Sequence, residues 1–230
     1  MNITTATMSA PADPQLPEQR AEPLAGPMVE HAARYAEDRH WDVFPGAWLE
    51  ISGGVPHCSC GAADCEAPGA HPVQEDWAAQ ATGSVTVVRR LWADRPDASV
   101  LLPTGRTFDV VEVPESTGCL ALARMERLGV RLGPVIGTPD GRMLFFVLPG
   151  GAVKIPDLVR KLGWSPSGLG LTALGEGDWV AAPPSRLGTR GPVLWARRPT
   201  DANRWLPDVE EIIPPLAYAC GRDAAAARGA

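Results

Sequence analysis

Apolar positions repeat with a helical period at several places in the chain. In the stretch MVEHAARYAEDRHW, Met28, Ala32, Tyr35 and Ala36 fall on one face of a helix. Similar spacing, with glycine or proline at the end of some segments, predicts four more helices at residues 84–96, 115–129, 156–162 and 208–219.

Shorter apolar runs between these segments predict strands. The run DVFPGAWLEI predicts one strand, and SVLLPTG with TFDVVEV predicts a pair around a turn at Gly105. The segment PVIGTPDGRMLFFVLPG has the form of a hairpin with Asp140-Gly141 as its turn, and GDWVAAPPS with PVLWARR predicts a further strand pair. Because hairpins and helices are mixed along the chain, the expected fold class is α+β rather than a doubly wound parallel sheet.

The composition indicates one globular domain between two tails. Residues 1–26 lack apolar periodicity and are predicted to be disordered, residues 27–219 form the domain, and residues 220–230 form a second disordered tail. No apolar run approaches the roughly 20 residues that span a bilayer. The N-terminus also lacks the pattern of a signal peptide. We therefore expect a cytoplasmic protein without membrane contact.

The net charge of −6 excludes a protein coated in basic surface, so any nucleic-acid contact must use a local patch. Arginines crowd one stretch, at positions 186, 190, 197, 198 and 204, and Trp195 and Trp205 accompany them. Arg186, Arg190, Arg197 and Arg198 are candidate contacts to a phosphate backbone, and the tryptophans could stack on bases. The simpler interpretation, which we favour, is a solvated arginine face with tryptophans in the core.

The segment HCSCGAADCEAPGAHP concentrates the chain's metal-binding side chains. Cys58, Cys60, Cys65 and His71 have the spacing C-x-C-x4-C-x5-H. Three thiolates and one imidazole form the closed tetrahedral set of structural zinc sites, so this metal would hold a loop rather than react. A loop of unligated thiols and a regulatory disulfide are the alternatives, and His57 is a substitute ligand. Cys119 and Cys220 are expected to be buried, inert thiols.

Several segments together resemble a known family. YAEDRHWDVFP, CSCGAADCEAPGAHP with Trp77 after it, VLLPTG, FDVVEV, GTPDGRMLFFV and DWVAAPPS follow one another in the order of the primase-polymerase (Prim-Pol) domain. The chain resembles an actinobacterial member of the archaeo-eukaryotic primase superfamily over residues 28–200. The resemblance implies a two-layer primase-polymerase-like domain with a mixed or antiparallel sheet, helices and a zinc-bound loop.

The resemblance also implies a nucleotidyltransferase site that uses Mg²⁺ or Mn²⁺. Such a site has two acids spaced two apart on a strand, a histidine after a TPSGG turn and a further acid before PPS. The spacing puts both carboxylates on one face of the strand, where they can hold the two metal ions of phosphoryl transfer.

The corresponding residues of this chain depart from the family pattern. Glu112 takes the place of the first acid, Pro114 that of the second, and Met143 that of the histidine. Asp109 and Glu112 lie three apart, so on a strand they point to opposite faces. Glu115 could join Glu112 only if the strand ended at Pro114.

The other two family positions are altered as well. Leu171, Thr172 and Ala173 stand where the third acid is expected, and Ala70 replaces a family lysine. Glu176 and Asp178 are nearby and are expected to belong to a turn.

Three functions remain open from the sequence. The first is a Prim-Pol-like protein that handles single-stranded DNA or nucleotides with a degenerate site, helped by separate replication proteins. The second is an active primase-polymerase that uses Asp109, Glu112 and Glu115 in a shifted geometry. The third is a non-catalytic protein-interaction module.

Overall fold

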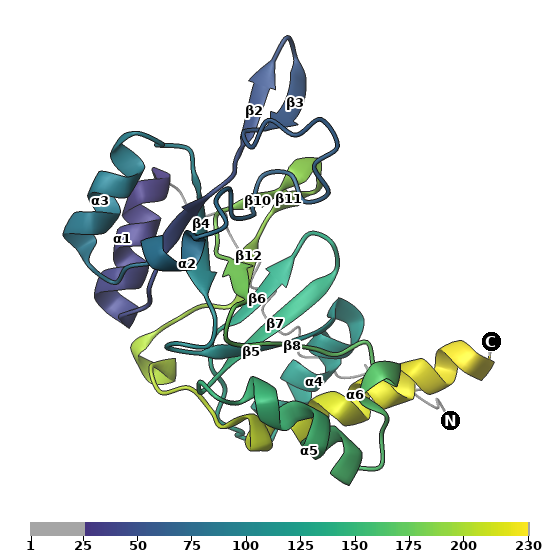
Figure 1. Ribbon diagram of the computed structural model, residues 1–230. Helices are drawn as coiled ribbons and strands as arrows, with labels where there is room; N and C mark the ends of the chain where they lie inside the picture. The colour runs from purple at the N-terminus through teal and green to yellow at the C-terminus, as the bar shows by residue number, and fades with distance from the viewer. Residues whose placement is uncertain (1–25, 230) are drawn as a thin grey trace, which may run out of the picture.

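The computed structural model describes residues 26–229 (Figure 1). The tail predicted at the N-terminus therefore lies, apart from Gly26, outside the described residues. The helices are α1 (Met28–Arg39), α2 (Trp77–Gln80), α3 (Val85–Ala93), α4 (Glu115–Arg127), α5 (Ile155–Lys161) and α6 (Val209–Gly229). Short 3-10 turns are η1 (Ala152–Lys154), η2 (Pro166–Gly168), η3 (Gly188–Arg190) and η4 (Asp201–Asn203).

A five-stranded antiparallel sheet forms the centre of the domain. Its order is β12 (Leu194–Arg197), β6 (Val135–Thr138), β7 (Arg142–Val147), β5 (Asp109–Pro114) and β8 (Thr172–Leu174). A three-stranded antiparallel sheet contains β1 (Phe44–Gly46), β4 (Ser99–Pro103) and β9 (Trp179–Ala181). Two small pairs complete the strands: β2 (Leu49–Ser52) with β3 (Val55–Cys58), and β10 (Arg186–Leu187) with β11 (Gly191–Pro192). The α+β fold class expected from the sequence is confirmed.

Helices α1, α3, α4 and α5 and the β6–β7 hairpin follow their sequence patterns closely. In α4 the buried positions Thr117, Ala121 and Met125 recur every fourth residue. The helix ends where Gly129 adopts a positive φ of 66° and the amide of Val130 donates to the carbonyl of Met125. None of the described helices is long and apolar enough to cross a membrane.

The predicted pairing of neighbouring strands is wrong in two places. β4 and β5 do not pair around Gly105, because β4 lies between β1 and β9 while β5 lies between β7 and β8. β9 and β12 likewise belong to different sheets. The single strand predicted for DVFPGAWLEI is two strands, β1 and β2, in different sheets. For β4 and β5 both edges of a buried strand are paired with strands distant in sequence.

The C-terminal helix is longer than its apolar pattern predicts. It was expected to end at Ala219 before a disordered tail, but it continues to Gly229. Cys220 is still buried in the core, and the alanine-rich sequence after it has high helix propensity. Cys119, expected to be buried, is exposed on α4, whereas Cys220 is buried as expected.

Two hydrophobic cores lie on the two faces of the five-stranded sheet. One core joins α1, α3 and the three-stranded sheet to one face, and includes stacked Phe108 and Phe146 at 4.5 Å between ring centroids. The other core packs α4, α5 and α6 against the opposite face. Figure 1 shows these helices on one side of the sheet and α1 with α3 on the other. The central sheet is therefore covered on both sides.

Tyr35 connects α1 to distant parts of the first core. Its hydroxyl donates to the carbonyl of Pro183 at 2.5 Å and accepts from the indole nitrogen of Trp195 at 3.2 Å. Burial raises the pKa of the Tyr35 phenol well above its usual range. The neutral hydroxyl thus satisfies two buried groups from other elements.

Replacing Tyr35 with phenylalanine should lower the free energy of unfolding by about 1–3 kcal/mol, because the substitution leaves buried polar groups without partners. Urea unfolding followed by tryptophan fluorescence measures the change. The matched control Tyr218→Phe affects a half-exposed ring. It should change stability by less than about 0.5 kcal/mol. Equal stability of Tyr35→Phe and wild type would refute this role.

Candidate functional site

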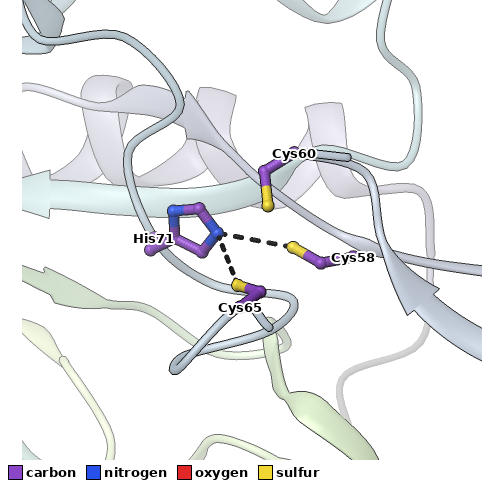
Figure 2. Close-up of side chains that lie close together, drawn as sticks. All are labelled: Cys58, Cys60, Cys65 and His71. Carbon is purple, nitrogen blue, oxygen red and sulfur yellow. Dashed lines mark hydrogen bonds between the residues drawn. The ribbon is translucent and has the colours of Figure 1, made fainter. Parts of the chain in front are cut away.

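The four predicted metal ligands meet at one point. Cys58 ends β3, while Cys60, Cys65 and His71 lie on the loop after it. Figure 2 shows their side chains pointing toward a common centre, and all four ligand atoms lie within 4.8 Å of one another. Within residues 26–229 this is the one group of three or more His, Cys, Asp or Glu side chains gathered closely enough to hold an ion.

The distances inside this cluster fit a tetrahedral ion. His71 Nε2 lies 3.4 Å from the Cys58 sulfur and 3.3 Å from the Cys65 sulfur. Zn–S and Zn–N bonds of about 2.3 and 2.0 Å place a sulfur and a nitrogen ligand atom about 3.5 Å apart at tetrahedral angles. His71 Nδ1 donates to the carbonyl of Pro72 at 2.7 Å, which leaves Nε2 free of hydrogen to bind a metal. The residues present fit zinc.

The cysteines of the cluster differ in pKa. A hydrogen bond from the backbone amide of Ala62 lowers the pKa of Cys60 to about 7, which favours its thiolate, whereas burial raises the pKa of Cys65 to about 11. His57, the substitute ligand, instead pairs with Glu50 at 3.2 Å on the exposed β2–β3 hairpin. The cluster has four protein ligands, and such closed coordination serves structure rather than reaction.

The metal loop also contacts the rest of the domain. The amide of Gly188 donates to the carbonyl of Pro68 at 2.6 Å, and the Ser99 hydroxyl donates to the carbonyl of Gly69 at 2.5 Å. Gly69 has a φ of 89°, and a Cβ there would lie 2.9 Å from the carbonyl oxygen of Arg186. The cluster thus lies on a loop that packs directly on β10 and η3.

The acidic strand β5 presents its carboxylates to opposite faces, as strand periodicity predicts. Glu112 pairs across the sheet with Leu144 and lies on the side of the first core. Its carboxylate accepts from Arg142 Nε at 2.5 Å, and Arg142 Nη2 donates to the carbonyl of Gly170 at 2.9 Å. Both side chains are about three-quarters buried, at 23% and 25% exposure. The Glu112 carboxylate is therefore already paired with the guanidinium of Arg142, which the carbonyl of Gly170 also holds.

Asp109 has a structural partner on the other face. It is buried, and its Oδ2 accepts from the amide of Ala152 at 2.8 Å at the start of η1. Its Oδ1 has no hydrogen-bond partner among the described residues. Asp109 thereby fixes the start of the η1–α5 segment.

Glu115 is the exposed first residue of α4, directly after Pro114. Partial burial of the Cys119 thiol, one turn along the helix, and then the charge of Glu115 raise the pKa of Cys119. Asp109, Glu112 and Glu115 do not form a cluster that could hold an ion within the described part of the chain.

The residue of the β6–β7 hairpin that faces Glu112 is Arg142 and not Met143. Met143 pairs with Val113 and is buried against α4, where a Cβ on Gly118 would lie 2.8 Å from it. It cannot occupy a histidine position on the Glu112 face. Arg142 pairs with Pro114 and projects toward Glu112 instead. The sequence interpretation missed Arg142. Its signal was the turn predicted at Asp140-Gly141; in the structure three residues, 139–141, join the paired Thr138 and Arg142 and fix the register.

The residues at and near the expected position of the third family acid lie where the sequence predicts. Thr172 and Ala173 lie on β8 beside β5. Glu176 lies in the turn before β9, and Asp178 accepts from the amide of Gly175 across it at 3.0 Å.

The predicted arginine patch is divided among separate places. Arg186 and Arg190 are exposed beside the metal loop. Arg197 pairs with Glu126 of α4 at 2.9 Å. Arg198 instead lines a cavity of about 190 Å³ against α1. A bulge between Trp195 and Arg197 accompanies this divergence. Trp195 is buried in the core as favoured, but Trp205 is 78% exposed.

A family model described as bifunctional DNA primase/polymerase, N-terminal, matches residues 32–205. The chain belongs to the Prim-Pol family. Neither a curated protein nor a solved structure matches it. The match covers the five-stranded and three-stranded sheets of the Prim-Pol domain, the metal cluster, Glu112 and Arg142, while α6 lies beyond it. The placement in the archaeo-eukaryotic superfamily and the actinobacterial type stay predictions.

The purified Prim-Pol protein should carry about one zinc ion per chain, because its Cys₃His set matches structural zinc sites. Metal content by inductively coupled plasma mass spectrometry measures this. Cys60→Ala should remove the metal and make residues 57–72 sensitive to protease while the sheets stay folded. Cys119→Ala, a control at an exposed thiol outside the cluster, should keep the metal. An unloaded wild-type protein whose loop thiols all react under reducing conditions would refute the zinc site.

Proposed function

We propose that this Prim-Pol protein binds single-stranded nucleic acid or nucleotides without synthesising primers. The observation that carries the proposal is the ion pair between Glu112 and Arg142. Membership of the family supports contact with nucleic acid or nucleotides. Separate replication proteins are the expected partners of such a domain.

The ion pair opposes catalytic metal binding for an electrostatic reason. Two-metal phosphoryl transfer needs carboxylates that share divalent ions about 3.5–4 Å apart. A guanidinium bound to Glu112 occupies the carboxylate and repels a second cation from it. Pro114 at the second acid position has no side-chain ligand to offer. We therefore infer that the residues present do not fit the pair of catalytic ions.

A surface between α1 and the end of β12 is our candidate for nucleic-acid contact. We call it the α1–β12 surface. Its cationic members are Arg34, Arg39, Arg198 and Arg204, and the acidic residues Glu37, Asp38 and Asp201 lie among them. Burial and the charge of Arg204 lower the pKa of Arg39. A phosphate placed beside these guanidinium groups would relieve their mutual repulsion. Exposed Trp205 follows Arg204 and is available to stack on a base.

The metal loop is a poor alternative for phosphate contact. Residues 40–88 contain no lysine or arginine, and acidic residues are distributed through them. Three thiolates on one Zn²⁺ would add a further net negative charge. Phosphates would be repelled there unless Arg186 and Arg190 at the edge of the loop compensated.

The unmodified chain should make little or no primer when supplied with nucleotides, Mg²⁺ or Mn²⁺ and a single-stranded template. Positioned metal ions and charge stabilisation supply most of the rate in phosphoryl transfer, and the proposed geometry lacks the paired carboxylates. Gel analysis of labelled products measures synthesis. Template-dependent synthesis abolished by Glu112→Ala would contradict this proposal and establish the active enzyme that uses Asp109, Glu112 and Glu115.

Two double substitutions test why the chain is expected not to bind the catalytic metal ions. Pro114→Asp with Arg142→His places a second acid and an imidazole on the Glu112 face, and should increase Mn²⁺ binding measured by calorimetry. Pro114→Asp with Met143→His is the matched control, because position 143 points into the core beneath α4. Equal Mn²⁺ binding by the two variants would refute the assignment of faces.

Binding to single-stranded DNA should be weak and steeply salt-dependent, because only a local cluster on an acidic protein attracts phosphate. Arg198→Gln with Arg204→Gln should weaken binding by about tenfold, as expected for the loss of two phosphate contacts. Fluorescence anisotropy at several salt concentrations measures both effects. Arg160→Gln with Lys161→Gln on exposed α5 is the charge-matched control. A larger loss from Arg186→Gln with Arg190→Gln would place the contact at the metal loop, and no binding by any variant would favour the interaction module.

A further inference from the structure

A groove between α4 and α6 has features that neither the metal cluster nor the Prim-Pol site explains. It encloses about 480 Å³, and its lining includes Leu120, Ala121, Arg124, Arg127, Tyr218 and Arg222. The two helices pack against each other on the far side of the sheet from α1 (Figure 1). Because α6 lies outside residues 32–205, the matched family segment supplies one wall of the groove at most.

The groove combines exposed apolar side chains with positive charge. Leu120 lines the groove and is 70% exposed. Beside it, the guanidinium of Arg124 lies 5.5 Å from the centre of the Tyr218 ring on α6, which is half-exposed. Clustered apolar side chains of this size on a surface mark an interaction site.

Small residues form the floor of the groove. Thr117 and Ala121 on α4 face Pro215 and Ala219 on α6. Small side chains between two helices leave room for the larger side chains of a third element. A groove with small and apolar residues between two helices suits the apolar face of an amphipathic helix.

The charged residues of the groove indicate what kind of ligand it binds. Arg124, Arg127 and Arg222 line the groove, and Asp223 is the acidic residue that accompanies them. We propose that the α4–α6 groove binds an amphipathic helix of a partner protein, whose leucine face covers Leu120 and Tyr218 and whose acidic residues pair with the arginines. This proposal is independent of whether the domain synthesises primers.

A synthetic peptide of about four helical turns tests the proposal on the full chain. The probe carries leucines at positions i, i+3, i+4 and i+7 with glutamates beside them. Its controls are a scrambled peptide, a peptide with lysine in place of glutamate, and a short oligothymidylate. Fluorescence anisotropy should show that the chain binds the glutamate peptide at least about tenfold more tightly than the lysine peptide.

Variants locate the binding and reverse its charge preference. Arg124→Glu with Arg127→Glu should weaken binding of the glutamate peptide by about tenfold and favour the lysine peptide. Leu120→Ser should also weaken binding, while Val153→Ser, at an 81% exposed apolar residue elsewhere, should not. Circular dichroism checks that each variant is folded. The proposal is overturned if the glutamate peptide does not bind, if these substitutions leave its affinity unchanged, or if oligothymidylate competes for the groove.

Discussion

Burial of the five-stranded sheet on both faces governs the rest of this structure. α1, α3 and the three-stranded sheet cover one face, and α4, α5 and α6 cover the other. A strand enclosed in this way cannot leave a charged side chain without a partner, because an unpaired buried charge is costly. Glu112 pairs with Arg142, and Asp109 accepts from the amide of Ala152. The two acids of β5 are therefore committed to internal contacts on opposite faces.

The metal cluster relates to a different constraint, which is the low stability of a short hairpin outside the central sheet. The β2–β3 hairpin and the loop after it lie at one end of the domain, and an isolated two-stranded hairpin is only marginally stable (Figure 1). Four side chains that could hold a metal ion lie within one short segment at the base of the hairpin. The contact between Pro68 and Gly188 connects this segment to η3 and Arg190. Metal binding in such a loop is coupled to local folding.

The proposed interaction surfaces lie on opposite sides of the central sheet. The α1–β12 surface combines arginines with an exposed tryptophan, which suits phosphate and base. The α4–α6 groove combines arginines with leucine and tyrosine over small residues, which suits an acidic helix. A domain arranged in this way could hold nucleic acid on one side and a partner protein on the other. Such a role depends on binding geometry and does not require phosphoryl transfer.

The sequence by itself determined the local features of this protein. Helical periodicity located α1 and α4, the Asp140-Gly141 turn located the β6–β7 hairpin, and the spacing of Cys58, Cys60, Cys65 and His71 predicted the metal cluster. These features depend on residues close together in the chain. Tertiary structure decided which strands share a sheet, because β4 and β5 take their partners from distant segments. It also decided that Arg142, rather than Met143, faces Glu112. That choice depends on cross-strand register, since a shift of one residue moves a side chain to the opposite face.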